Sequence, residues 1–195
     1  MPWGVGDKIM LHPAVKLKKS LIQGSGLIAV KKIPKGTILW RLGNSDRIYS
    51  PQEYKKFSKK YRKLLDKYSY IDDFDRFVYC TDNAKYWNHS CNPNSSSLQA
   101  VDMEIAIKDI QPREEITFDY ALVMGDDETM RCCCGAKNCR KVIKKIDEDS
   151  MLCKRLRKQV VNVVKYLGKV EQPLLTAEDI CPCGSGKKYK KCHGK

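Results

Sequence analysis

Ten cysteines, eight of them in three short stretches, limit how this 195-residue chain can fold. Seven lie in "RCCCGAKNC", which starts at Arg131, and in "CPCGSGKKYKKCHG", which starts at Cys181. An eighth, Cys91, lies in the polar run "YWNHSCNPNSSS". No apolar block with a small-residue cleavage site is visible near Met1, so we expect an intracellular chain. In such a chain, clustered cysteines favour metal binding over disulfides.

The second cysteine stretch contains a complete set of zinc ligands. Zinc prefers four nitrogen or sulfur ligands in a tetrahedron, and four occur here within thirteen residues. The glycines of "CGSG" allow the backbone to turn tightly around an ion. We expect one zinc ion on Cys181, Cys183, Cys192 and His193.

The first cysteine stretch offers three ligands of suitable spacing, Cys132, Cys134 and Cys139, whereas a closed structural site needs four. In its polar run, Cys91 is a buried filler, a nucleophile or a metal ligand. No general base stands at nucleophile spacing, which disfavours a hydrolase. We therefore expect Cys91 to complete a second zinc site, with Cys133 pointing elsewhere. Two further cysteines, Cys80 and Cys153, have apolar neighbours and are expected to be ordinary buried residues.

The formal charge of +14 is unevenly distributed along the chain. Residues 1–50 and 151–195 are strongly basic, and residues 101–150 are acidic. Basic ends indicate contact with nucleic acid or an acidic partner, or simply a solvated lysine-rich surface. The acidic middle is suited to attract a basic peptide. No apolar run approaches the ~18 residues that cross a bilayer, so no membrane span is expected.

The hydrophobic pattern predicts a mainly β chain with helices, an α+β fold. Strands are expected at residues 9–17, 27–33, 37–42 and 77–80, within 96–110 as a hairpin around 101–103, and after the turn at 112–113. A helix is predicted over residues 51–68, because Ser50 and Pro51 form a good start. Another is predicted over 147–166, with Ser150 as cap and Gly168 as stop. Its apolar stripe is expected to pack against the domain.

Four motifs in order, "GSGLIAVKKIPKG", "NHSCNPN", "EEITFDY" and "CCCGAKNCRK", resemble the SET-domain protein lysine methyltransferases with their post-SET cysteine segment. The final "CPCGSGKKYKKCHG" resembles the SEC-C zinc motif. The resemblance implies a SET fold of several small β-sheets with a threaded C-terminal segment. It places a SET domain at residues 8–122, with a helical insert at 51–78. A post-SET zinc segment would follow at 130–142, a helix at 146–169 and the SEC-C-like motif at 178–195.

The resemblance also assigns site residues. S-adenosylmethionine would be bound by Gly24, Ser25, Gly26, Tyr86, Asn88 and His89. The channel for the substrate lysine would be formed by Tyr86, Phe118 and Tyr120, with Tyr120 as the catalytic residue. The chain departs from the family pattern at Lys85, where Arg is usual, at Thr81-Asp82, where Gly-Asn is usual, and at the additional Cys133.

The implied function is S-adenosylmethionine-dependent protein-lysine N-methylation of histones or other basic proteins, with two zinc ions per chain. Phe118 predicts di- or trimethylation, because it lacks the hydroxyl that would anchor a water beside the amine. The alternative is a non-catalytic zinc-binding module that recruits protein or nucleic acid. The expected location is the cytoplasm, or the nucleus of a host for an effector or viral protein.

Overall fold

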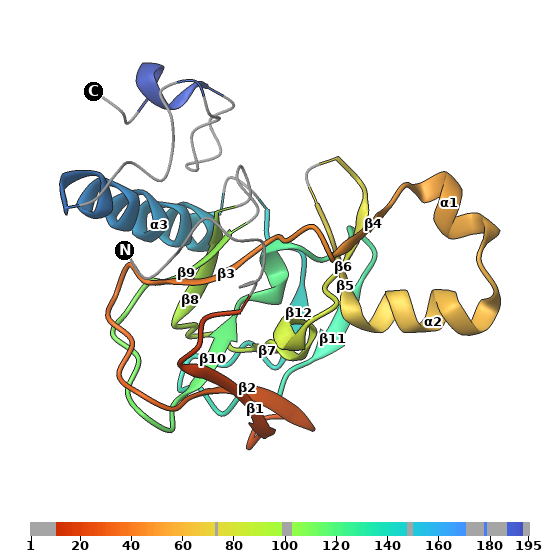
Figure 1. The fold of residues 1–195 in the computed structure, drawn as a ribbon, viewed down its shortest axis with the longest axis horizontal. Helices are drawn as coiled ribbons and strands as arrows, with labels where there is room; N and C mark the ends of the chain where they lie inside the picture. The colour runs from red at the N-terminus through yellow and green to blue at the C-terminus, as the bar shows by residue number, and fades with distance from the viewer. Residues whose placement is uncertain are drawn as a thin grey trace.

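The computed structural model describes residues 11–72, 74–98, 103–147, 150–170, 178 and 187–192. Within these ranges the chain forms several small β-sheets accompanied by few helices (Figure 1). The mainly β, α+β architecture expected from the sequence is confirmed. None of the helices in this described part is both long and apolar enough to cross a membrane.

The first sheet brings three of the four sequence motifs side by side. Its order is β1-β2-β10-β7, and its strands are β1 (Val15–Lys19), β2 (Ser25–Ala29), β10 (Glu115–Phe118) and β7 (Asn88–His89). β2 pairs antiparallel with β1 and with β10, and β7 pairs parallel with β10. The turn before β2 requires a glycine at position 24, where φ is +54°.

A second sheet, of order β3-β9-β8, carries much of the core. Its strands are β3 (Ile38–Arg41), β9 (Met103–Ala106) and β8 (Ser95–Leu98). Leu39 and Ile105 of this sheet are fully buried, as are Leu27 and Ile116 of the first. Burying such side chains stabilises the fold by roughly 1.5–3 kcal/mol each.

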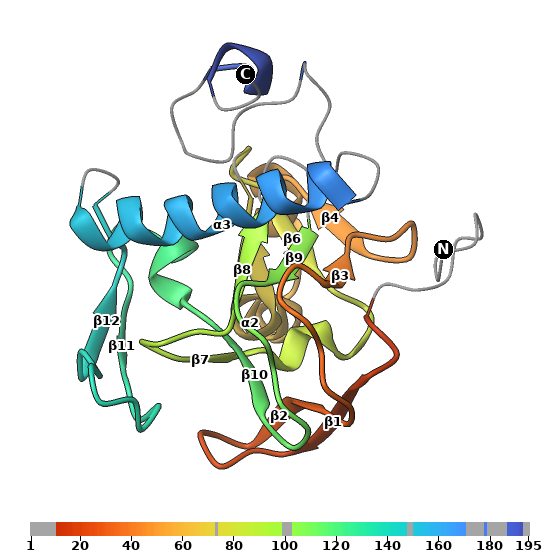
Figure 2. The same cartoon turned by 90° about the vertical axis from the view of Figure 1, so that its left-hand side faces the viewer.

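Helix α3 (Met151–Val170) contacts β8 and lies across this sheet (Figure 2). Ser150 caps it as predicted, because its hydroxyl accepts a hydrogen bond from the Cys153 N–H at 3.1 Å. The helix extends to Val170, two residues beyond the Gly168 stop that the sequence predicts. An interior glycine costs only ~1 kcal/mol. Cys153 and Val160 are buried, so the expected packing of this helix against the domain is confirmed.

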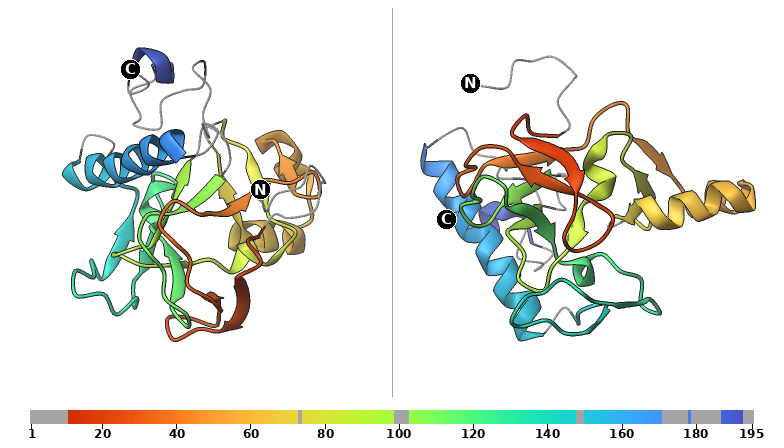
Figure 3. Two further views of the ribbon diagram at one scale, coloured as in Figure 1. Left: turned by 60° about the vertical axis from the view of Figure 1, so that its left-hand side comes forward. Right: turned by 90° about the horizontal axis from the view of Figure 1, so that it is seen from below.

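The third sheet carries the helical insert, which projects from one side of the molecule (Figures 1 and 3). Its order is β4-β6-β5, with strands β4 (Arg47–Tyr49), β6 (Phe77–Tyr79) and β5 (Ser69–Ile71). The helix predicted over 51–68 is instead two helices, α1 (Pro51–Lys56) and α2 (Lys59–Tyr68). Ser58 caps α2 through the Tyr61 N–H, and Phe57 leaves the helical path to pack edge-on against Tyr49.

The remaining strands, β11 (Thr129–Arg131) and β12 (Val142–Lys144), form a two-stranded sheet that flanks the cysteine segment. Short 3-10 helices occur at Asn83–Tyr86, Tyr120–Leu122 and Tyr189–Lys191. Of the four ligands predicted for the C-terminal zinc ion, Cys192 is described, whereas Cys181, Cys183 and His193 lie outside the described residues.

Candidate active site

The glycine turn and Asn88 meet at the edge of the first sheet. The Asn88 side-chain amide donates to the carbonyl oxygens of Gln23 at 3.1 Å and Ser25 at 3.0 Å, and to Oε1 of Glu115 at 2.7 Å. The residues predicted to bind the cofactor at Gly24, Ser25, Gly26 and Asn88 are therefore adjacent. Gln23 and Glu115 were not assigned to this site from the sequence, because cross-sheet hydrogen bonds leave no mark in motif spacing.

Gly26 is required by close packing at the same corner. A β-carbon at this position would lie 2.1 Å from Oε1 of Glu115 and 3.0 Å from Nδ2 of Asn88. Glu115 is held in place by the Ser20 hydroxyl, which donates to both carboxylate oxygens at 2.8–2.9 Å. Around Gly24 the equivalent space is open, which leaves room for a ligand beside the turn.

Tyr120 links this corner to the aromatic side of the molecule. Its backbone N–H donates to Nδ1 of His89 at 3.1 Å, and its hydroxyl donates to the Trp87 carbonyl oxygen at 2.5 Å. Burial, with a smaller contribution from the Glu115 charge, raises the pKa of Tyr120 to about 12. The phenol therefore stays protonated at physiological pH and serves as a hydrogen-bond donor.

A cavity of about 600 Å³ opens on the other side of Tyr120. Aromatic side chains contributed by several elements dominate its wall: Trp40, Tyr68, Tyr70, Phe77, Trp87, Phe118 and Tyr120. Phe118 is buried, and its ring centroid lies 6.5 Å from that of Tyr120. Both Phe118 and Tyr120, two of the three predicted channel residues, thus line one cavity.

Tyr86 is placed differently from the other predicted channel residues. It is the last residue of the 3-10 helix at Asn83–Tyr86, and its ring centroid lies 5.6 Å from that of Tyr68. It is not part of the cavity wall described above. The neighbouring Trp87 lines the cavity instead and also packs against the core.

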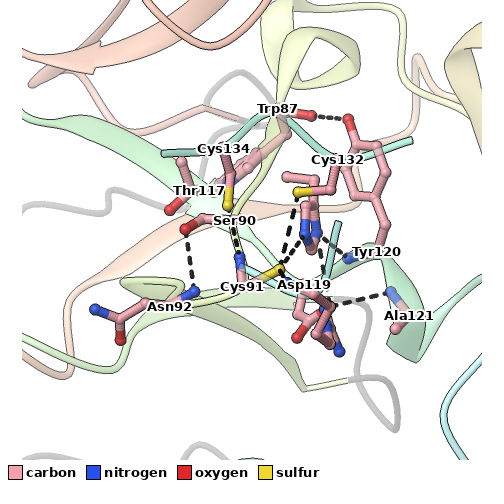
Figure 4. A network of polar contacts seen from close by, with 12 residues as sticks. Trp87, Ser90, Cys91, Asn92, Thr117, Asp119, Tyr120, Ala121, Cys132 and Cys134 are labelled. Atoms are coloured by element: carbon pink, nitrogen blue, oxygen red, sulfur yellow. Dashed lines mark hydrogen bonds and ion pairs between the residues drawn. The ribbon is translucent and has the colours of Figure 1, made fainter. Parts of the chain in front are cut away.

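Three of the predicted zinc ligands converge beside the site (Figure 4). The sulfurs of Cys91 and Cys132 are 3.8 Å apart, and the Cys91 N–H donates to the Cys134 sulfur at 3.4 Å. Burial disfavours a thiolate at Cys134, but hydrogen bonds from the Cys91 and Ala136 N–H groups and neighbouring thiols lower its pKa to about 6. A group of sulfurs that accepts backbone N–H bonds fits a thiophilic metal such as zinc.

Two residues, His89 and Cys139, are candidates for the fourth metal ligand of this cluster. Ligand atoms of His89, Cys91, Cys132 and Cys134 all lie within 4.8 Å of one another. Nδ1 of His89 accepts the Tyr120 N–H, so the neutral ring carries its proton on Nε2, 3.3 Å from the Cys91 sulfur. Burial lowers the pKa of His89, which keeps the ring neutral. The His89 Nε2–H thus donates a hydrogen bond to the Cys91 sulfur and does not act as a metal ligand. Cys139, whose sulfur lies 3.9 Å from the Cys132 carbonyl oxygen, remains the predicted fourth ligand.

The other cysteines agree with the sequence-based expectations. Cys80 and Cys153 are buried, whereas Cys133 is exposed and its sulfur lies 3.6 Å from the Ile22 carbonyl oxygen. The Cys133 sulfur therefore points away from the other three clustered cysteines and toward the chain just before the glycine turn.

Two buried polar residues that the sequence did not assign hold these motifs together. Asn94 accepts the Thr117 N–H at 2.9 Å and donates to the Glu115 carbonyl oxygen at 2.9 Å, which ties "NHSCNPN" to β10. Asp119 pairs with Arg140, two residues outside any predicted site. Asp119 stands between apolar residues in the sequence, whereas Asn94 and Arg140 lie in polar runs and gave no such signal.

Comparison with known proteins finds two family models that match this chain. The SET domain family model matches residues 24–121, which is half of the chain, and the SEC-C motif model matches residues 179–195. The crystal structure of KRYPTONITE in complex with mCHH DNA, H3(1-15) peptide and SAH has 23% sequence identity and a TM-score of 0.47. The match covers 68% of this chain and 30% of that one.

Several curated proteins are also similar in sequence. The histone-lysine N-methyltransferase trr of Drosophila melanogaster is 37% identical over 139 residues, which cover 65% of this chain and 6% of that protein. The H3 lysine-9 specific histone-lysine N-methyltransferase of Schizosaccharomyces pombe is 30% identical over 161 residues, which cover 65% of this chain and 32% of that protein. The chain spans less than a tenth of the length of the Drosophila proteins trr and Set2. With half of its residues matched by the family model, the chain belongs to the SET-domain family.

Proposed function

We propose that this chain is an S-adenosylmethionine-dependent protein-lysine N-methyltransferase. The observation that carries the proposal is the position of Tyr120. Its backbone is bound to His89, next to the Asn88 corner, while its ring lines the aromatic cavity. A methyl donor in the corner and a lysine in the cavity would meet at this tyrosine.

The corner fits the cofactor chemically. Asn88, the turn at Gly24 and the packed Gly26 would hold it, and open space adjoins Gly24. Bound S-adenosylmethionine supplies a methyl group on a positively charged sulfonium. The chain's contribution is mainly positioning, because an in-line transfer depends on aligning donor and acceptor.

The cavity fits the second requirement, a neutral amine. A free lysine has a pKa of ~10.4, so neutralising it at pH ~8 costs about 3 kcal/mol. An aromatic wall accepts the cation on entry and excludes water, and the desolvation lowers the amine pKa. Because the Tyr120 pKa is raised, its phenol acts by holding a fixed hydrogen-bond geometry and not by removing a proton.

Zinc on Cys91, Cys132, Cys134 and Cys139 would fasten the post-SET segment to the catalytic motifs. Cys91 follows β7 closely, and Cys132 follows β11, so one ion would fix two segments about forty residues apart. The Glu128–Met130 stretch before Cys132 lines the cavity. Loss of this ion would therefore release part of the cavity wall. A second zinc ion, on Cys181, Cys183, Cys192 and His193, belongs to the same proposal.

For the substrate we propose an extended basic segment of a histone or another basic protein. β5 is an edge strand, and its residues Ser69, Tyr70 and Ile71 line the cavity. An extended peptide can add to such an edge through main-chain hydrogen bonds. The relatives named as histone-lysine methyltransferases support this class of substrate. The basic ends of the chain would suit contact with nucleic acid near that substrate.

The proposed end product carries two or three methyl groups. Phe118 has no hydroxyl, so it offers no anchor for a water beside the amine, and methylated amines gain room to rotate. This aromatic position lies in the cavity wall next to Tyr120.

Calorimetry with S-adenosylhomocysteine and transfer of labelled methyl groups to histones test the proposal. Binding together with transfer to lysine is the expected result. Protein that holds zinc but neither binds the cofactor nor transfers methyl groups would support the alternative, a non-catalytic recruitment module.

A further inference from the structure

Three buried polar atoms without a hydrogen-bond partner line the aromatic cavity. They are Nε1 of Trp40, Oγ of Ser69 and Oε2 of Glu104. Buried polar atoms are nearly always hydrogen-bonded, so three around one cavity indicate that a polar group occupies it during function. Among them, the carboxyl of Glu104 is the group able to carry a full negative charge.

The sheet register directs Glu104 into this cavity. Its cross-strand neighbours are Trp40 on β3 and Ser97 on β8, and all three residues line the cavity wall. The hydroxyls of Ser95 and Ser97 lie beside the Glu104 carboxyl and oppose the rise in its pKa, and its Oε2 has no hydrogen-bond partner. Trp40 is only 4% exposed, so its indole forms a rigid wall beside the carboxyl.

Trp87 connects Glu104 to the proposed catalytic tyrosine. The Trp87 indole N–H donates to Ser95 at 3.1 Å, and the Trp87 carbonyl oxygen accepts the Tyr120 hydroxyl. Ser95 in turn contacts the Glu104 carboxyl. Glu104 and Tyr120 are thus on the same cavity wall and separated by two side chains.

The surroundings of Glu104 favour a bound cation. Burial raises the pKa of this carboxyl well above its usual range, because no positive charge is paired with it. Aromatic faces of the kind that enclose ammonium groups surround the cavity. The other ionisable side chains in the wall are Asp66, Lys67, Tyr68, Tyr70, Cys80, Lys85, Tyr120 and Glu128.

We propose that Glu104 is a positioning residue that accepts an N–H hydrogen bond from the amine of the target lysine, and that this contact ends methylation at dimethyl-lysine. The inference rests on the proposed methyltransferase function and narrows its product. A neutral lysine amine has two N–H groups, a monomethylamine has one and a dimethylamine has none. Glu104 therefore holds the amine for the first two transfers and loses its contact before the third.

Two substitutions of Glu104 distinguish the effect of its charge from the effect of its acceptor oxygens. Glu104→Leu removes both oxygens, and Glu104→Gln keeps one acceptor oxygen without the charge. Asp127→Asn is the matched control, because Asp127 is an exposed carboxylate outside the cavity wall. Thermal unfolding verifies that each variant is folded, and the glutamine variant carries the test if the leucine variant does not fold.

The experiment measures kcat and KM on lysine peptides that carry zero, one or two methyl groups, with mass spectrometry of the products. Wild type should stop at dimethyl-lysine. Glu104→Leu should lose about tenfold in kcat/KM on the unmethylated and monomethyl peptides and be unchanged on the dimethyl peptide, as expected for a lost charge-assisted hydrogen bond. Glu104→Gln should fall between wild type and Glu104→Leu, and Asp127→Asn should match wild type.

Calorimetry in buffers of different ionisation enthalpy adds a readout that does not depend on turnover. On peptide binding, wild type should release one proton more than Glu104→Gln, because the Glu104 carboxyl ionises as it accepts the N–H hydrogen bond and a glutamine has no such proton to lose. Equal discrimination among the three peptides by wild type and Glu104 variants, with equal proton release, would overturn this inference alone and leave the methyltransferase intact. No transfer by wild type to any lysine would overturn both.

Discussion

Asp119 and Arg140 form an ion pair that joins the catalytic motif to the cysteine segment. Nη2 of Arg140 lies 2.5 Å from Oδ1 of Asp119, and the two side chains are 25% and 1% exposed. Asp119 directly precedes Tyr120, and Arg140 directly follows Cys139. The same carboxylate oxygen lies 3.6 Å from Nδ1 of His89. The pair therefore fixes the proposed catalytic residue relative to the proposed metal site.

Arg140→Leu should lower the free energy of unfolding by roughly 3 kcal/mol, because it leaves a buried carboxylate without its partner. Denaturant unfolding of zinc-loaded protein measures the change. Lys137→Ala, an exposed position in the same segment, is the control and should be near neutral. A loss below about 1 kcal/mol, typical of surface pairs, would contradict the structural importance of the pair.

Gly26→Ala should weaken binding of S-adenosylhomocysteine by at least about tenfold, or ~1.4 kcal/mol. The added β-carbon would collide with Glu115 and displace the Asn88 amide from the turn. Leu21→Ala, in the same hairpin but fully exposed, should leave the affinity unchanged. Calorimetry makes the comparison, and equal affinity in both variants would place the cofactor elsewhere.

Cys91→Ser should remove one of two zinc ions per chain and abolish methyl transfer. The loss follows because the cluster fixes the segment that contributes Glu128 and Met130 to the cavity wall. Cys153→Ala, a buried cysteine on α3, should retain both ions. Metal analysis and a transfer assay decide the matter, and full activity with Cys91→Ser would refute this role.

Phe118→Tyr should shift the end product to monomethyl-lysine while turnover continues. A hydroxyl at this buried position beside Tyr120 can anchor a water that occupies the space of a methyl group. A difference of ~1.4 kcal/mol in activation free energy suffices to change the ratio of the second to the first methyl-transfer rate tenfold. Mass spectrometry of peptide driven to completion measures it. Monomethyl product from the natural sequence would show that another residue fills the space.

The stability of wild type relative to Glu104→Gln should fall as pH rises. The folded-state pKa of Glu104 is raised, so the folded protein binds this proton more tightly than the unfolded chain. The stabilising contribution is complete below the ordinary glutamate pKa of ~4.3 and is lost as pH rises through the raised value. Denaturant unfolding from pH 5 to pH 9 tests the sign. An opposite slope would mean that Glu104 is ionised and paired in the folded state.

Motif spacing predicted which residues would meet, but it could not predict the contacts that hold them. The sequence predicted that Cys91 shares a metal site with the distant cysteine segment. In the structure Cys91 lies beside Cys132 and Cys134, which agrees with that prediction. It assigned no role to Asn94, Asp119 or Arg140, because a long-range polar pair has no local periodicity. The sequence also assigned no role to Glu104. Alternation of polar and apolar residues along a strand predicts which face of the sheet a residue is on, but not whether that face adjoins a cavity.

The predicted helix over 51–68 failed for a local physical reason. Both halves have helical propensity, but Ser58 caps the second half, and Phe57 gains ring contacts with Tyr49 and Tyr61 by leaving the helix. Tertiary packing of one aromatic residue thus outweighed the propensity of its neighbours. Site residues on strands, such as Gly26, Asn88 and Phe118, were predicted from the family resemblance and not from secondary-structure patterns.

The most direct measurement is methyl transfer to a lysine-containing histone peptide by zinc-loaded wild type and by Tyr120→Phe. Removing this hydroxyl breaks its bond to the Trp87 carbonyl oxygen but leaves the cofactor corner at Asn88 in place. Wild type should methylate lysine, whereas Tyr120→Phe should bind S-adenosylhomocysteine normally and lose at least about a hundredfold in kcat, or ~2.7 kcal/mol. Absence of lysine methylation by folded, cofactor-bound wild type, or undiminished kcat in Tyr120→Phe, would contradict the assignment of this site.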